Sequence, residues 1–110
     1  MANYTPAALV KQIDNQVGRQ LRQVDWALVE AKGRKAVADL RQNLNNAKIY
    51  SQDYELSEMR DEQLDNAKKA TKWLDKARQN ILRASEFNVF GAVDVAHLTA
   101  QIDQAKADLK

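Results

Sequence analysis

The histidine and the acidic residue before it are the pair whose spacing suggests proton-transfer chemistry. Asp94 lies three residues before His97, so on a helix both side chains would share one side of the first turn. Such a pair could act as a general base with its orienting carboxylate. That chemistry also needs a nucleophile and an oxyanion donor, and neither Ser57 nor Ser85 has the glycine context of a nucleophile elbow. We therefore interpret Asp94 as a helix cap and predict no catalytic residue and no enzyme activity.

Four carboxylates, Glu58, Asp61, Glu62 and Asp65, are crowded into about one and a half turns of a predicted helix. Carboxylate oxygens can hold Mg²⁺ or Mn²⁺, and di-metal sites in helical bundles combine Glu with Glu-x-x-His pairs. No such pair occurs here, and the chain has no cysteine and one histidine. Isolated glycines also provide no phosphate-binding loop. We expect a solvated acidic face, no metal and no cofactor.

The most concentrated charge in the chain is basic and lies on the same predicted helix. It consists of Lys68, Lys69, Lys72, Lys76 and Arg83, which fall within an arc of about 100°. This basic face could follow the phosphates of a nucleic acid or bind an acidic protein. However, Asp65 precedes Lys69 by four residues, in the order that favours an ion pair, and no aromatic residue is expected among the lysines. We interpret the face first as solvated and rank nucleic acid as the alternative partner.

Large apolar residues outside the helical pattern are the candidates for a protein interface. They are Trp26, Val29, Phe87 and Phe90. Trp26 falls nearly opposite the apolar stripe of its predicted helix, and the two phenylalanines lie in a loop that ends in glycine. Either these residues close the ends of a bundle or they contact another protein, because aromatic side chains are enriched at binding hot spots. A homodimer that buries Trp26 and Val29 against their own copies is one such arrangement.

The elements that position these residues are helices, because apolar residues recur at steps of three and four. The predicted helices span about 6–31, 34–50, 58–84 and 95–109. Thr5 and Pro6 start the first helix, Gly33 ends it in a left-handed cap, and Ser57 and Asp94 cap the last two helices. A change of phase near Gly33 favours two separate helices over one continuous helix. The predicted fold is all-α, an antiparallel bundle of about four helices in one domain, 1–110.

The core of this bundle is expected along four apolar stripes. Their members are Val10, Ile13, Val17, Leu21, Val24, Leu28, Ala31, Val37, Leu40, Leu44, Ala47, Met59, Ala67, Ala70, Trp73, Leu74, Ala77, Ile81, Ala84, Val95, Leu98, Ile102, Ala105 and Leu109. Because many of them are alanine, neighbouring helices should approach closely.

Length and composition exclude several classes of protein. A chain of 110 residues with 45% hydrophobic and 29% charged residues is within the globular range, and its net charge of +2 favours neither sign. No apolar run approaches the ~20 residues that span a bilayer, and the start lacks a signal-peptide pattern. We therefore predict a cytoplasmic, non-enzymatic protein that binds another protein, in a regulatory, adaptor or antidote role. The alternative is a nucleic-acid-associated accessory protein that uses the basic face.

Overall fold

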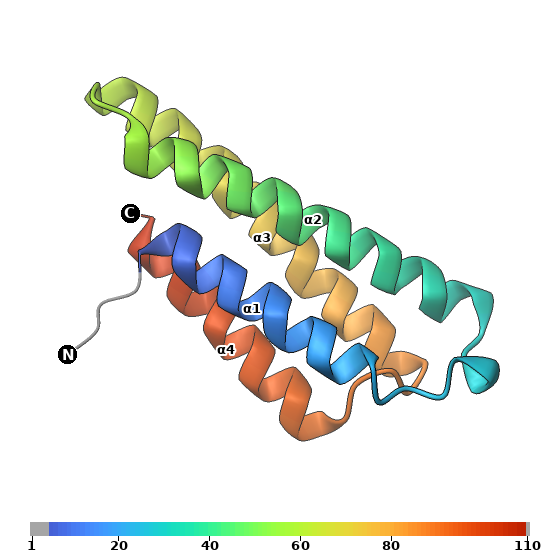
Figure 1. Cartoon of the computed structure of the whole chain (residues 1–110). Helices are drawn as coiled ribbons and strands as arrows, with labels where there is room; N and C mark the ends of the chain where they lie inside the picture. The colour runs from blue at the N-terminus through green and yellow to red at the C-terminus, as the bar shows by residue number, and fades with distance from the viewer. Residues whose placement is uncertain (1–4, 110) are drawn as a thin grey trace.

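The computed structural model describes residues 5–109, and these form a bundle of four helices (Figure 1). The helices are α1 (Pro6–Leu21), α2 (Ala31–Leu56), α3 (Arg60–Glu86) and α4 (Ala92–Asp108), with a 3-10 turn η1 (Trp26–Leu28) between α1 and α2. Consecutive helices run in opposite directions, and each packs against two neighbours so that α1 and α4 close the ring. The prediction of an all-α, single-domain bundle is confirmed for these residues, while residues 1–4 and 110 lie outside the described part.

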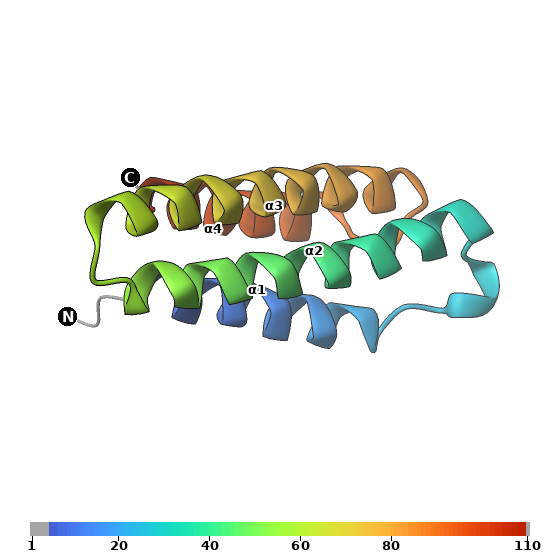
Figure 2. The ribbon, with the colours of Figure 1, turned by 90° about the horizontal axis from the view of Figure 1, so that it is seen from above.

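The second and third helices are much longer than the first and the last. α2 and α3 have 26 and 27 residues, whereas α1 and α4 have 16 and 17. At about 1.5 Å per residue this is roughly 40 Å against 25 Å. Figure 2 shows α1 lying along α2 and α4 lying along α3, so the molecule is elongated, with extents of 48 × 30 × 17 Å. α2 and α3 therefore contain most of the helical residues of the bundle.

Every helix contributes fully buried aliphatic side chains to one core. They are Val10, Ile13 and Val17 of α1, Leu40 and Leu44 of α2, Leu74 and Ile81 of α3, and Leu98 and Ile102 of α4. Buried alanines lie between α2 and α3, among them Ala47, Ala70 and Ala77. α2 and α3 form the most extensive helix pair, because they are the two longest helices and their small buried side chains allow close approach.

Some predicted core positions are exposed instead. Leu28 and Met59 lie at helix ends with 81% and 62% of their surface accessible. Leu21, Val24, Trp73 and Val95 are half-buried at the edge of the core. Ala31, the first residue of α2, is exposed as well. Apart from Trp73 in the middle of α3, these residues lie at or near helix ends, where the helical period no longer decides which side faces the core.

The first helix is shorter than the apolar pattern predicts. Thr5 starts it as expected, with its Oγ1 accepting from the N–H of Ala8 at 3.2 Å. The helix ends at Leu21 rather than at Ala31, so the predicted separation from α2 is confirmed but lies earlier in the chain. Beyond the end, Asp25 Oδ1 accepts from the N–H of Ala27 and caps η1. This local side-chain bond competes with helix continuation.

Gly33 does not end a helix, which corrects the prediction of a left-handed cap. It is buried in the first turns of α2, and no glycine in the described chain has a positive φ. α2 also starts at Ala31 rather than Arg34, and it continues past Tyr50 to Leu56. The physical reason for glycine here is close packing, because a Cβ at this position would lie 2.8 Å from Phe87 Cβ.

Two further capping predictions are wrong. Ser57 ends α2, where its Oγ donates to the carbonyl of Asp53 and accepts from Asn66 Nδ2, so α3 starts instead after Met59. Asp94 lies inside the first turn of α4, and Gly91 occupies the N-cap position. The Asp94 carboxylate still complements the positive end of the helix dipole without capping the helix.

Candidate functional site

The basic face predicted on α3 lies on the outer side of this helix, away from the core. Lys68, Lys69, Lys72, Lys76 and Arg83 are all exposed. The opposite side of α3 is buried through Ala70, Leu74 and Ala77, so the helical period turns the five cations outward together.

Two of these five cations are already paired with carboxylates of their own helix. Lys69 Nζ lies 3.0 Å from Asp65, and Arg83 Nη1 lies 3.3 Å from Glu86. The hydrogen bond and Coulomb attraction of Asp65 raise the pKa of Lys69 above its usual value. Lys68, Lys72 and Lys76 form no ion pair with any residue of 5–109. These three ammonium groups therefore remain available to a partner.

An aromatic ring lies beside two of the free lysines, contrary to expectation. The Nζ atoms of Lys72 and Lys76 lie 5.4 and 4.6 Å from the ring centroid of Trp73. Trp73 itself is half-buried and packs against the core. Such cation–π contacts contribute about 0.5–1 kcal/mol at exposed sites. They restrain both lysine side chains near the surface of α3.

The free lysines border a shallow groove of about 630 Å³, which we call the lysine groove. It is lined by Leu64, Ala67, Lys68, Thr71, Lys72, Asp75, Lys76 and Gln79 of α3 and by Leu109, which directly follows α4. Leu64, Ala67 and Leu109 supply apolar surface beside the cations. The groove thus combines an apolar floor with a basic rim.

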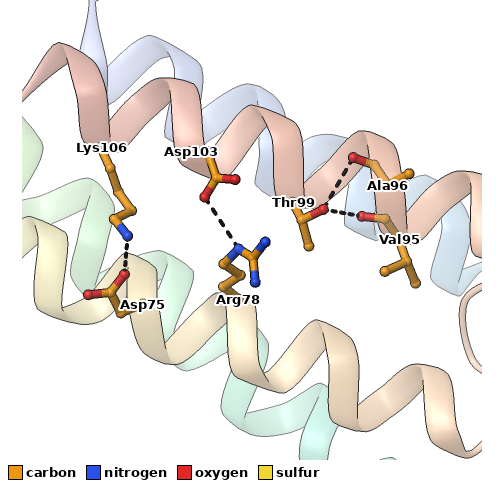
Figure 3. Close-up of polar contacts among 7 residues, drawn as sticks. All are labelled: Asp75, Arg78, Val95, Ala96, Thr99, Asp103 and Lys106. Atoms are coloured by element: carbon orange, nitrogen blue, oxygen red, sulfur yellow. Dashed lines mark hydrogen bonds and ion pairs between the residues drawn. The ribbon is translucent and has the colours of Figure 1, made fainter.

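The carboxylate that lines the groove is neutralised by α4. Lys106 Nζ forms an ion pair with Asp75, and Arg78 Nε pairs with Asp103 at 3.3 Å (Figure 3). In the same view the hydroxyl of Thr99 donates to backbone carbonyls of α4, so it makes no link to α3. The α3–α4 ion pairs leave the rim lysines as the uncompensated charge of the groove.

The apolar interface candidates lie at the opposite end of the bundle and are largely enclosed. Val29 and Phe90 are buried, with 8% and 4% of their surface accessible. Phe87 is half-buried against Gly33. Trp26 is half-buried too, and its Nε1 donates to the carbonyl of Leu21 at 3.2 Å. These positions favour the interpretation that the four residues close the bundle end.

The structure does not bring together the residues considered for catalysis or metal binding. His97 is exposed, and within the described chain it makes no hydrogen bond to Asp94. Asp61, Glu62 and Asp65 are exposed near the α2–α3 turn. No group of three or more His, Asp or Glu side chains among residues 5–109 is placed to hold a metal ion.

The chain has no detected similarity to known proteins. No protein-family model matches it, and no curated protein and no solved structure matches it either. None of the helices within residues 5–109 has the length and apolar character needed to cross a membrane. We therefore infer the function from the surface chemistry of the bundle.

Proposed function

We propose that this protein is a non-enzymatic, protein-binding helical bundle whose lysine groove docks an acidic amphipathic helix of a partner protein. The observation that carries the proposal is the combination of three unpaired lysines, Lys68, Lys72 and Lys76, with the apolar floor of the same groove. Leucines on one face of a helix would cover the floor, and flanking glutamates would meet the lysines.

The dimensions of the groove suit a helical segment. From Leu64 to Gln79 the groove follows α3 for about 22 Å at 1.5 Å per residue, which corresponds to roughly four helical turns. Restraint of Lys72 and Lys76 by Trp73 reduces the side-chain entropy lost on binding.

A protein partner accounts for the groove better than a nucleic acid does. Phosphates would gain from the lysines but not from the apolar floor formed by Leu64 and Leu109. Asp61 and Asp65 lie on the same outer side of α3 and would repel a phosphate backbone. An acidic protein helix whose glutamates lie beside Lys72 and Lys76 would use both the floor and the rim and would keep its charges away from Asp61 and Asp65.

The proposal is tested by fluorescence anisotropy of a labelled synthetic peptide with leucines on one helical face and glutamates beside them. We expect the native protein to bind this peptide and the Lys72→Glu/Lys76→Glu variant to bind it at least about tenfold more weakly, which is about 1.4 kcal/mol. Lys11→Glu/Lys32→Glu is the matched control, because it changes the net charge equally at exposed lysines outside the groove.

Two results would contradict the proposal. The first is equal binding of a scrambled peptide with the same composition, which would show that the charge alone is recognised. The second is binding of a DNA or RNA oligonucleotide with a steep salt dependence and no binding of the peptide. That second result would establish the nucleic-acid alternative.

A further inference from the structure

We infer that the lysine groove is occupied, in the absence of another partner, by α3 of a second copy of this chain in an antiparallel homodimer. The inference rests on the proposed function, because it assigns an acidic helix to the same groove. The acidic helix would be the first turns of α3 in the second copy, which carry Asp61, Leu64 and Asp65.

The charges along the outer side of α3 are complementary to themselves when the helix is reversed. The midpoint of this symmetry lies between Lys68 and Lys69. Asp61 and Lys76 are equally far from it along the chain, and so are Asp65 and Lys72. Asp61, Asp65, Lys72 and Lys76 are all exposed. At 100° per residue these two acids and two bases also fall within an arc of about 60°.

A twofold axis through this midpoint would therefore bring opposite charges together. It places Asp61 against Lys76 of the second copy, and Asp65 against Lys72 of the second copy. Because a twofold interface uses the same surface on both chains, each of these ion pairs forms twice. The Trp26 end has no comparable arrangement, since Val29 and Phe90 are buried there.

The same axis brings an exposed leucine to the groove. Leu64 is 44% exposed and lies on the side of α3 that faces α4, where the groove lies. The twofold relation sets it at the level of position 73 of the second copy, between the groove residues Lys72 and Asp75 along that copy's α3. Each chain would thus insert one leucine between the lysines of the other, in the position proposed for a leucine of a partner protein.

The association is expected to be reversible. Exposed ion pairs are individually weak and are screened by salt. Lys68 comes opposite Lys69 of the second copy near the axis, although Asp65 already pairs with Lys69. Because the dimer and a partner protein use the same groove, self-association would compete with partner binding as the protein concentration rises.

The dimer is tested with two charge-reversed variants in sedimentation velocity at low salt. One variant carries Asp61→Lys and Asp65→Lys, and the other carries Lys72→Glu and Lys76→Glu. We expect the native chain to shift with concentration from 12.5 kDa to twice this mass. Each variant alone should stay a monomer, and their equimolar mixture should restore the dimer because the opposite charges meet again. Restoration cannot come from a variant that has failed to fold.

The inference is overturned if the native chain stays monomeric at several hundred micromolar, if both variants dimerise alone, or if their mixture stays monomeric. The proposed function is tested separately with the Asp61→Lys/Asp65→Lys variant, which keeps the lysines of the groove. Peptide binding by this variant together with a monomeric native chain would refute the dimer and would still support the proposed function. A native dimer together with a variant that binds no peptide would refute the proposed function and would still support the dimer.

Discussion

Phe87 packs against the backbone of Gly33, so that a methyl group at position 33 would lie 2.8 Å from Phe87 Cβ and 2.9 Å from Val29 Cγ1. This contact joins the start of α2 to the end of α3 and closes one end of the bundle. It explains why a residue with poor helix propensity is found inside a helix. It also shows that the start of α2 is positioned by a residue at the end of α3.

We predict that Gly33→Ala destabilises the protein by about 1–3 kcal/mol, because the added methyl group would force Phe87 to shift at its Cβ, the side-chain atom bonded directly to its backbone. Gly18→Ala is the control, since its nearest atom is Nη1 of the flexible Arg41 side chain at 3.1 Å. The gain in helix propensity should make this second variant up to about 1 kcal/mol more stable. Urea denaturation measures both; equal effects at the two glycines would contradict the packing argument.

Ser51 is fully buried on α2, and its Oγ has no hydrogen-bond partner within residues 5–109. Removing an unsatisfied buried hydroxyl should relieve a desolvation penalty, so we expect Ser51→Ala to keep or raise stability, by up to about 1 kcal/mol. Ser57→Ala provides the comparison, because the Ser57 hydroxyl bonds to Asp53 and Asn66 and its loss should cost about 1 kcal/mol. Thermal unfolding followed by circular dichroism separates the two outcomes.

Leu74 and Ile81 are fully buried at the centre of α3. Truncating either to alanine should lower the free energy of unfolding by about 2–5 kcal/mol, because a cavity remains in the core. Lys72→Ala, on the exposed side of the same helix, should lower it by no more than about 1 kcal/mol, the contribution of its contact with the Trp73 ring. Comparable losses of stability at Leu74 and Lys72 in chemical denaturation would show that the buried side of α3 has been assigned wrongly.

Leu64 and Leu82 provide a matched test of the apolar floor. Both belong to α3 and have similar exposure, 44% and 42%, but Leu64 lines the lysine groove and Leu82 does not. Covering part of a leucine contributes about 1–1.5 kcal/mol, so Leu64→Gln should weaken binding of the acidic peptide about tenfold. Leu82→Gln should leave that affinity unchanged in the same anisotropy titration. A loss of affinity at both positions would mean that the peptide does not recognise the groove.

Local periodicity alone was enough to predict four helices and most of their buried sides. Val10, Ile13 and Val17 in α1, like Leu74 and Ile81 in α3, are buried as their spacing predicts. Because side chains three and four residues apart share one side of a helix, this information is contained in neighbouring residues. The same periodicity placed the five cations of the basic face on the outside of α3.

Helix ends and the groove depended on contacts between residues far apart in the chain. No local signal distinguishes Gly33 as a packing residue from Gly33 as a cap, because the difference is made by Phe87. Likewise the sequence predicted the exposed lysines. It did not predict that Leu109 contributes to the floor of the groove, because this requires α4 to lie against α3. The pairing of Asp75 with Lys106 has the same origin. Side-chain spacing determines one helix at a time, whereas the shape and net charge of a groove arise only when two helices meet.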